Sequence, residues 1–554
     1  MKFSSKALSQ TITQLCLAKG IDHIVISPGS RNAPLTIGFT QHEDFHNFSI
    51  VDERSAAFFG LGLAQQLQKP VVLVCTSGSA LLNYYPAIAE AFYSNIPLIV
   101  LSADRPSHLI DVGDGQTIRQ ENVFDNHILY SANCKEGGSH QVYNETEMNI
   151  ALNTAIELQG PVHINIPFTE PLYETSETST VSPQDVPVRI SSEEEVIDLD
   201  AVTEAWNDSP KKMIVVGTLF PDSVERQWLD ALAHDKSVIV LTETTSNLHN
   251  NNFFPCIDQL IAPLSEAQLS TLAPDVLLTF GGMIVSKKVK AFLRSHSPKH
   301  HFHVHPKTAN DTFFVLTEHI QVTVNSFLAS FIPKAAKTNS NYRDTWLAIK
   351  EERISKHRAF VETAPFSDFL VYARIIEQLP EPLQLQLSNS TAIRYSQLFD
   401  LPSEVRVFCN RGTSGIDGSN STAIGAAYIS STPTLLLTGD LSFFYDSNAF
   451  WNDHIPNDFR IIVVNNSGGG IFRILPNAKK AAQFETFFET KHNLTARPIC
   501  ELYNLEYASA RDASDVKEAL DTFYAPSNRP RLLEIFTPSE VNDEVLKDYF
   551  KRIS

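Results

Sequence analysis

Short apolar runs alternate with longer amphipathic stretches along almost the whole 554-residue chain. Runs that are apolar throughout are typical of strands buried on both faces, as in parallel sheets covered by helices. The runs fall into three sets, which predict an α/β protein with three doubly wound parallel sheets. The expected strands are 24–26, 48–51, 71–75, 98–101 and 162–166, then 213–216, 238–241, 276–280 and 302–304, then 383–387, 405–409, 434–437, 461–464 and 532–535.

A chain of this length is too long for one hydrophobic core, so we expect each set to form its own domain. The expected domains cover residues 1–180, 190–340 and 355–554. Residues 172–188 are rich in Thr, Ser, Glu and Pro and are expected to be an exposed linker. The charged stretch 333–358 is expected to be a helix that crosses into the third domain.

Charge and composition exclude several classes of protein. With 63 acidic and 44 basic residues, the formal net charge is -19, which argues against nucleic acid as a partner. No apolar run approaches the roughly 20 residues of a membrane-spanning helix, and no signal-peptide core is evident, so we expect a cytoplasmic protein. The six cysteines lie far apart without a Cys-x-x-Cys pair, which disfavours a disulfide framework or a structural zinc site.

Two polar motifs follow neighbouring strands of the third set. Gly-Asp-Leu-Ser places Asp440 after one strand, and Asn-Asn-Ser-Gly-Gly places Asn466 after the next, 26 positions later. Carboxylate, carboxamide and backbone oxygens are ligands that suit Mg²⁺, and nearby glycines let the backbone approach a diphosphate. Gly-Asp is also a common turn and Asn-Asn-Ser-Gly is ordinary loop chemistry, so a structural role stays open at this point.

Polar side chains also follow strands of the first set. Ser30 and Arg31 follow one strand, and Glu53, Thr76 and Arg105 follow three others. Ligands of open α/β sheets gather beyond the carboxyl ends of the strands, and an arginine can hold a carboxylate through two parallel hydrogen bonds. The alternatives are a capping serine, a surface arginine and an acid at a helix N-terminus, the last contributing under about 1 kcal/mol.

Further motifs extend this pattern along the chain. They are Ser-Pro-Gly-Ser-Arg at 27–31, Asp-Glu-Arg-Ser-Ala-Ala at 52–57, Thr-Ser-Gly-Ser-Ala at 76–80, Ala-Asp-Arg-Pro at 103–106, Gln-Thr-Ile-Arg-Gln at 116–120, Ser-Asn-Ser-Thr-Ala-Ile-Arg at 388–394 and Asn-Arg-Gly-Thr-Ser-Gly-Ile-Asp-Gly at 410–418. In this order, the motifs resemble the 2-succinyl-5-enolpyruvyl-6-hydroxy-3-cyclohexene-1-carboxylate synthase family of thiamine-diphosphate enzymes, which acts in menaquinone biosynthesis. The resemblance spans nearly the whole chain and is weakest between about 180 and 350.

The resemblance implies a pyrimidine-binding first domain, a central domain and a diphosphate-binding third domain. It also implies a homo-oligomer, a dimer or a tetramer, with active sites between subunits. Thiamine diphosphate and Mg²⁺ (or Mn²⁺) would support decarboxylation of 2-oxoglutarate, and the resulting carbanion would add to isochorismate in a Stetter-like 1,4-addition. The alternatives are another thiamine-diphosphate-dependent 2-oxo acid decarboxylase or synthase, and a binding protein that has kept the fold without catalysis.

The resemblance also implies roles for individual residues around the cofactor. Glu53 would promote the imino tautomer of the aminopyrimidine, and Ile416 would bend the cofactor, although Ile416 fits a core position as well. Asp440, Asn466 and the carbonyl of Gly468 match the metal ligands. The other positions implied to contact the cofactor are Thr76, Ser414, Leu441, Ser442, Gly469 and Ile471.

Two dicarboxylate substrates explain the arginines, because several carboxylates held together need fixed cations. The matching positions are Arg31, Arg105, Arg394 and Arg411, of which Arg394 and Arg411 join Glu53 as expected catalytic residues. The expected polar partners are Ser30, Gln116, Asn389 and Ser390. Ile471, Phe472 and Leu475 are expected to form an apolar wall against water. Lys287 is a further candidate for substrate contact, or for a regulatory site.

Two positions depart from the expected motifs, and three histidines need a separate interpretation. Leu441 stands where the diphosphate signature usually has glycine, and Gly115 stands where asparagine is expected. His301, His303 and His305 alternate along a predicted strand and therefore share one face. Zinc binding there is one interpretation, and a polar sheet surface is the one we favour.

Overall fold

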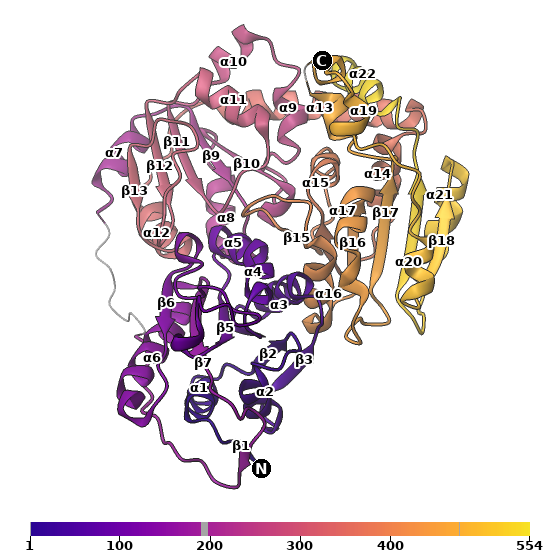
Figure 1. Ribbon diagram of the computed structural model, residues 1–554. Coiled ribbons are helices and arrows are strands. Elements are labelled where there is room, and N and C mark those ends of the chain that lie inside the picture. The colour runs from indigo at the N-terminus through magenta and orange to yellow at the C-terminus, as the bar shows by residue number, and fades with distance from the viewer. Residues whose placement is uncertain (1, 190–197, 476) are drawn as a thin grey trace.

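The strands of the chain form three parallel sheets that are enclosed by helices (Figure 1). The computed structural model describes residues 2–189, 198–475 and 477–554. A separate antiparallel pair joins β1 (Phe3–Ser4) to β8 (Thr175–Ser176). The expected α/β architecture with three parallel sheets is therefore confirmed.

The first and third sheets have the same strand order, with six parallel strands each. The first sheet runs β3-β2-β4-β5-β7-β6 and the third runs β15-β14-β16-β17-β19-β18. The strands of the first are β2 (His23–Ile26), β3 (His46–Ser49), β4 (Val71–Cys75), β5 (Leu98–Asp104), β6 (Tyr130–Asn133) and β7 (Val162–Pro167). Those of the third are β14 (Leu383–Leu387), β15 (Val405–Cys409), β16 (Thr434–Gly439), β17 (Arg460–Asn465), β18 (Glu506–Ala510) and β19 (Arg531–Phe536). Because parallel strands end at one edge, each sheet has one carboxyl edge for loops.

The central sheet has five parallel strands in the order β10-β9-β11-β12-β13. They are β9 (Lys212–Val216), β10 (Val238–Thr242), β11 (Val276–Phe280), β12 (His300–Val304) and β13 (Glu318–Ile320). The helix α13 (Tyr342–Thr363) leaves this part of the chain. Its Trp346 lies in the core beside the central sheet and its Phe360 in the core beside the third sheet, so the expected crossing helix is present.

The helices cover the sheets in chain order. The first sheet has α1 (Ala7–Ala18), α2 (Ala33–Thr40), α3 (Glu53–Leu67), α4 (Ser79–Asn83), α5 (Tyr85–Ser94) and α6 (Gln141–Leu158). The central sheet has α7 (Asp200–Asn207), α8 (Arg226–Ala233), α9 (Ile257–Ile261), α10 (Glu266–Leu272), α11 (Lys287–Ser295) and α12 (Val324–Phe331). The third has α14 (Asp368–Glu377), α15 (Thr391–Ser396), α16 (Ser419–Ile429), α17 (Asp440–Tyr445), α18 (Ile471–Ile474), α19 (Phe484–Phe487), α20 (Arg497–Leu502), α21 (Ala513–Phe523) and α22 (Asn542–Arg552).

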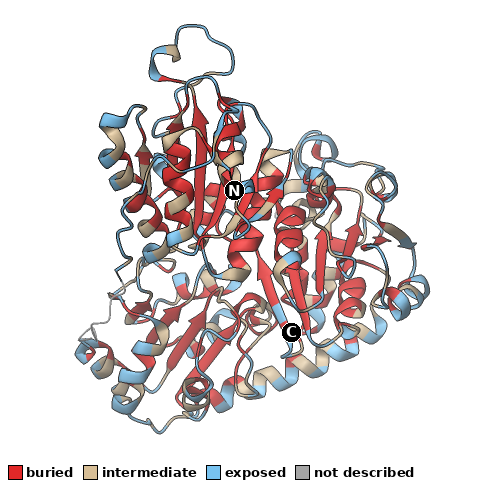
Figure 2. Cartoon of the chain, turned by 90° about the horizontal axis from the view of Figure 1, so that it is seen from below, coloured by how far each residue is buried: buried red, intermediate tan, exposed pale blue. Residues whose placement is uncertain are grey.

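Every strand expected from an apolar run is present, and the strands are the most deeply buried part of the chain (Figure 2). Apart from the short pair β1 and β8, the strands that the sequence analysis missed are β6, β13 and β18. Each of these is the last strand at one edge of its sheet. Edge strands are short and partly exposed, so their sequences carry polar residues and no continuous apolar run marks them.

The first and third sheets share one hydrophobic core, because α3 packs closely against α16 between them. The contact depends on two glycines. A Cβ on Gly62 would lie 2.1 Å from the carbonyl oxygen of Thr422, and one on Gly425 would lie 2.1 Å from that of Phe59. Only glycine permits this approach of two helix backbones.

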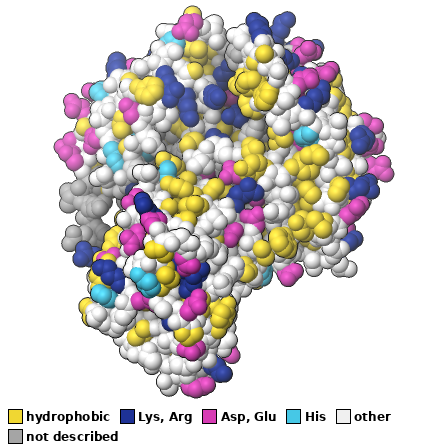
Figure 3. Space-filling view, viewed as in Figure 1, with side chains coloured by type: hydrophobic (Ala, Val, Ile, Leu, Met, Phe, Trp, Pro, Cys, Tyr) yellow, Lys and Arg dark blue, Asp and Glu magenta, His cyan; other side chains and the backbone are white. Residues whose placement is uncertain are grey.

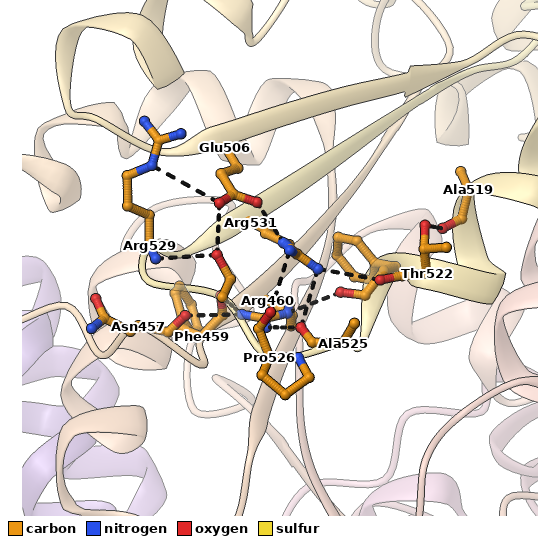
Figure 4. Close-up of polar contacts among 12 residues, drawn as sticks. Asn457, Phe459, Arg460, Glu506, Ala519, Thr522, Ala525, Pro526, Arg529 and Arg531 are labelled. Carbon is orange, nitrogen blue, oxygen red and sulfur yellow. Dashed lines mark hydrogen bonds and ion pairs between the residues drawn. The ribbon is translucent and has the colours of Figure 1, made fainter.

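Two arginines fix the edge of the third sheet that lies opposite the carboxyl ends of its strands (Figure 4). Arg460, which begins β17, donates to the carbonyls of Phe523 at 3.0 Å and Ala525 at 2.8 Å. Arg531, which begins β19, forms an ion pair with Glu506 at 2.5 Å. These contacts tie the amino ends of the strands to the segment after α21 and leave the carboxyl edge to the loops described below.

The preference for a polar sheet surface at His301 and His303 was wrong. Both side chains are buried on β12, and the Thr279 hydroxyl lies 2.9 Å from His301 Nε2 and 2.8 Å from His303 Nδ1. Burial lowers the pKa of His301 to about 4 and that of His303 to about 3. The two imidazoles are therefore neutral members of a buried polar cluster, and no metal-binding group of His, Cys, Asp or Glu occurs in the described ranges.

The cysteines behave as expected from their spacing. All six are free thiols, and Cys75 and Cys409, at the ends of β4 and β15, are buried. Burial raises the pKa of the Cys409 thiol to about 12, which makes it unreactive. None of the helices described in the structure combines the length and apolar character that crossing a membrane requires.

Candidate active site

Loops from β2 and β4 meet at the carboxyl edge of the first sheet. The backbone N–H of Arg31 donates to the hydroxyl of Thr76 at 3.2 Å. A side chain on Gly29 would collide with Thr76, at 2.4 Å from its Cβ. The guanidinium of Arg31 is buried and donates to the carbonyl of Phe168 at 2.9 Å and to Glu170 at 3.1 Å. The first of the expected anion-binding arginines is thus firmly held, with the exposed Ser30 beside it.

Arg105 and Gln116 belong to one loop system beyond β5. Arg105 donates to the carbonyl of Gly115 at 2.9 Å and pairs with Asp114 at 3.4 Å. The hydroxyl of Ser77 donates to the carbonyl of Gln116 at 3.0 Å, which brings this loop against the one that follows β4. Because position 115 contributes its backbone carbonyl, this contact with Arg105 does not need a side chain there.

Glu53 is the first residue of α3, and Asp52 caps that helix by accepting the N–H of Ser55 at 3.2 Å. The Glu53 side chain is half-buried. Burial raises the pKa of Cys75 well above its ordinary value, and the negative charge of Glu53 raises it further. The carboxylate of Glu53 therefore lies close enough to the end of β4 for its charge to affect the Cys75 thiol.

A compact donor set lies at the carboxyl ends of β16 and β17. Asp440 is buried, and its carboxylate accepts the N–H groups of Leu441 at 2.7 Å and Gly468 at 2.9 Å. Asn466 is also buried and donates its side-chain N–H to Asp368 at 2.9 Å. The other end of that amide, Asn466 Oδ1, has no partner among the residues described. A carboxylate beside an unpartnered carboxamide oxygen fits a hard divalent cation.

The backbone around this donor set is tightly constrained. Gly468 has φ +149°, and a Cβ there would lie 2.6 Å from the carbonyl oxygen of Glu489. His492 Nε2 lies 3.2 Å from Asp440 Oδ2. This distance is short enough for an ion pair, but the two groups do not form a hydrogen bond. The other ring nitrogen of His492 accepts the N–H of Leu494 at 3.1 Å, which assigns the proton to Nε2.

The remaining expected cofactor positions surround this set. The hydroxyl of Ser442 donates to the carbonyl of Ile416 at 2.7 Å, which joins the loop after β15 to the start of α17. Ile416 is half-buried. Ser414 has φ +63° and its hydroxyl lies 3.4 Å from the carbonyl of Arg411. Leu441 and Gly469 are adjacent to the donor set in sequence.

Arg394 and Arg411 lie close together beside the donor set. Arg411 is buried and donates to Asn389 at 2.8 Å, and Asn389 in turn donates to the carbonyls of Asn410 and Gly415, both at 2.7 Å. Arg394 donates to the carbonyl of Ser390 at 2.6 Å. Burial lowers the pKa of Arg394, and the nearby charge of Arg411 lowers it further. Two cations held this near each other favour an anion between or beside them.

A cavity of about 260 Å³ opens beside Arg394. Its wall includes Lys287 of the central sheet's helix α11, together with Ile471, Phe472 and Leu475. Figure 3 shows Lys and Arg side chains gathered on the face of the molecule where α11 lies. The cavity thus combines Arg394 and Lys287 with the apolar wall that the sequence analysis assigned to substrate.

The structure brings the expected residues together as two separate groups. One group, at the first sheet, contains Arg31, Glu53, Thr76 and Arg105. The other, at the third sheet, contains Asp440, Asn466, Arg394, Arg411 and the cavity wall.

Sequence reasoning missed several residues that support the site. Asp368 and Thr537 lie beside Asn466, and His492 lies beside Asp440. Glu243 is buried and accepts the N–H groups of Val285 at 2.7 Å and Ser286 at 2.6 Å, immediately before Lys287. Burial raises the pKa of Glu243 to about 7. Thr537 and Glu243 had a usable signal, because each follows a predicted strand by two positions.

Comparisons with known proteins give matches along most of the chain. The family model described as the N-terminal TPP binding domain of thiamine pyrophosphate enzymes matches residues 6–128, and that described as the middle domain of thiamine pyrophosphate matches residues 189–387. Curated proteins named 2-succinyl-5-enolpyruvyl-6-hydroxy-3-cyclohexene-1-carboxylate synthase are similar over their full length. Those of Christiangramia forsetii and Flavobacterium psychrophilum are 53% and 52% identical, each over 99% of both chains. That of Flavobacterium johnsoniae is 51% identical over 100% of both.

Proposed function

The chain belongs to the 2-succinyl-5-enolpyruvyl-6-hydroxy-3-cyclohexene-1-carboxylate synthase family of thiamine-diphosphate enzymes, and from this premise we propose how its residues perform that activity. It is a carbon–carbon bond-forming transferase of menaquinone biosynthesis. Its substrates are 2-oxoglutarate and isochorismate. We assign residues 1–180 to the pyrimidine-binding domain, 190–340 to the central domain and 355–554 to the diphosphate-binding domain.

The observation that carries the proposal is the buried, unpartnered carboxamide oxygen of Asn466 beside the carboxylate of Asp440. An unsatisfied buried acceptor costs about 1–3 kcal/mol unless a ligand meets it. We assign both groups, with the carbonyl of Gly468, to Mg²⁺ or Mn²⁺. The cation would hold the diphosphate, and Leu441, Ser442, Gly469 and Ile471 would lie along it.

At the other end of the cofactor, Glu53 would hydrogen-bond to the pyrimidine ring nitrogen and promote the imino tautomer, and Thr76 would also contact the cofactor. Ile416 would support the bend between the two rings, and Ser414 would be a further cofactor contact. Thiamine diphosphate, when bound, supplies the electron sink for decarboxylation of the oxo acid.

The arginines hold the substrate carboxylates. Arg394 and Arg411 would bind beside the apolar wall of Ile471, Phe472 and Leu475, with Asn389, Ser390 and Lys287 as partners. Arg31 and Arg105, with Ser30 and Gln116, would supply the other half of the substrate-binding site. Loss of a buried carboxylate clamp costs on the order of 2–5 kcal/mol, whereas an exposed pair contributes about 0–1 kcal/mol.

The two groups of residues complete each other between subunits of a homo-oligomer. This assignment follows from the resemblance of the motifs to the family, which implies active sites between subunits. The six free thiols suit a reducing compartment such as the cytoplasm.

A direct assay supplies the purified protein with thiamine diphosphate and Mg²⁺ and follows the consumption of 2-oxoglutarate. We expect carbon–carbon bond formation only when isochorismate is also present, and loss of turnover with a chelator. Conversion of pyruvate alone at a comparable rate would indicate a different oxo-acid enzyme. Turnover unaffected by the chelator would contradict the assigned cation.

A further inference from the structure

Asp368 is a fully buried carboxylate that touches one of the assigned cation ligands. It is the first residue of α14, 98 positions before Asn466 in the sequence. One carboxylate oxygen accepts the side-chain N–H of Asn466 at 2.9 Å, and the other accepts the hydroxyl of Thr537 at 2.5 Å. The backbone N–H of Asp368 donates to Asn542 at 2.9 Å, which fixes the start of the helix.

This contact determines which end of the Asn466 amide faces which way. A carboxamide has a donor end and an acceptor end of nearly equal shape, so sterics alone do not orient it. A carboxylate accepts hydrogen bonds and therefore takes the Nδ2 end. The oxygen, Oδ1, must then face away from Asp368, and it is the atom without a partner among the residues described. A reversed amide would place two oxygens against each other.

The carboxyl ends of adjacent strands bring these residues together. Asn466 follows β17, Thr537 follows β19, and these strands pair in parallel register up to Asn465 and Phe536. The assigned ligand Asp440 begins α17 directly after β16, on the other side of β17. The amide is thus supported by Asp368 at the start of α14, and Thr537, which follows one neighbouring strand, contacts Asp368. The second ligand, Asp440, follows the other neighbouring strand.

We propose that Asp368 is a positioning residue, which holds the Asn466 carboxamide with its oxygen toward the cation, and that Thr537 holds Asp368 in turn. The inference rests on the proposed cation site. Partners that orient a metal ligand commonly contribute about 10- to 100-fold in metal affinity. Asp368 itself is not a ligand in this arrangement.

A purely structural role for Asp368 is the competing explanation. An acid in the first turn of α14 also favours the helix through its charge. If Asp368 served only the helix, its removal would lower the stability of the protein without a specific effect on its affinity for the cation. A general negative charge near the cation would require ionised Asp368, whereas the orienting role requires only a hydrogen-bond acceptor.

The test measures Mg²⁺ affinity by titrating MgCl₂ into protein with thiamine diphosphate and following intrinsic fluorescence. We expect Asp368→Ala to weaken Mg²⁺ binding by about 10- to 100-fold. Asp368→Asn keeps an acceptor oxygen and should retain most of the affinity. Because Asp368 acts through Asn466, the double variant D368A/N466A should bind no more weakly than N466A alone.

Three results would overturn the inference. One is a D368A affinity within about twofold of the unmodified protein. Another is a D368N loss as large as that of D368A, which would assign the effect to charge. The third is a double variant whose loss is the product of the two single losses. If D368A does not fold, the comparison of D368N with the unmodified protein still separates charge from hydrogen bonding.

A matched control removes another buried carboxylate from the same domain. Asp446 is fully buried at the end of α17, and its carboxylate accepts the N–H and hydroxyl of Ser421 at 2.8 and 3.0 Å. D446N should change thermal stability and leave Mg²⁺ affinity unchanged. If the unmodified protein binds thiamine diphosphate without Mg²⁺ dependence, the proposed cation site itself fails. If it shows that dependence and D368A binds Mg²⁺ with unchanged affinity, only the role of Asp368 fails.

Discussion

Arg473 and Glu489 form a two-pronged ion pair, with one of the contacts at 2.7 Å. The side chain of Arg473 is 10% exposed and that of Glu489 is 1% exposed. The carbonyl of Glu489 also accepts the N–H of Gly469 at 2.6 Å. This pair therefore ties α18, which carries Ile471 and Phe472 of the cavity wall, to the segment that returns toward Asp440.

Breaking this pair should loosen the cavity wall. Glu489→Gln leaves the Arg473 guanidinium without its carboxylate, and removing one partner of a buried pair costs about 3–5 kcal/mol. We expect a lower unfolding midpoint and faster amide hydrogen exchange in residues 468–475. As a control, Arg374→Ala removes an exposed pair with Glu377. Unchanged exchange in E489Q would show that the pair does not hold the wall.

Gly62→Ala should weaken the packing between the first and third sheets. The added methyl group would lie 2.1 Å from the carbonyl oxygen of Thr422, which is backbone and moves only with α16. Overpacking costs about 1–3 kcal/mol, and we expect the upper part of that range. The thermal unfolding midpoint measures this loss of stability. Gly138→Ala, with no atom within 4 Å of the added Cβ, should change stability by under about 0.5 kcal/mol.

His163 should make stability depend on acid pH. It is fully buried, and burial lowers its pKa from 6.5 to about 3. The unfolded chain therefore binds a proton at His163 near pH 6.5, whereas the folded chain does not. The contribution of neutral His163 to the free energy of unfolding is fully present above pH 6.5 and is lost progressively as the pH falls toward 3. Denaturant unfolding at several pH values measures this slope. His163→Gln should reduce the slope, and an equal slope would contradict the assignment.

Sequence patterns could predict the central strands of the fold better than its edges. β4 is buried along its whole length and shows as an apolar run, whereas β6 at the edge of the same sheet carries Ser131 and Asn133. Likewise, Asp440 and Asn466 could be found because local motifs mark them. Asp368 could not, because only the tertiary fold brings the start of α14 to a residue 98 positions away.

Mixing two inactive variants should restore activity if the sites form between subunits. Glu53→Gln and Asp440→Asn remove groups from opposite halves of the site. A mixed dimer contains one unmodified site and one doubly altered site, so random mixing should recover about a quarter of full activity. Turnover after co-refolding or co-expression of the two variants measures the recovered activity. A mixture as inactive as each variant alone would place both halves in one chain.

The most direct test of the proposed chemistry compares binding with turnover in Glu53→Gln. Calorimetric titration with thiamine diphosphate and Mg²⁺ is followed by an assay with 2-oxoglutarate and isochorismate. Because the substituted carboxamide cannot give up a proton to the pyrimidine nitrogen while the cation ligands remain, we expect the cofactor to bind and product formation to be abolished. Product formation at the rate of the unmodified enzyme would contradict the role of Glu53 and the account built on it.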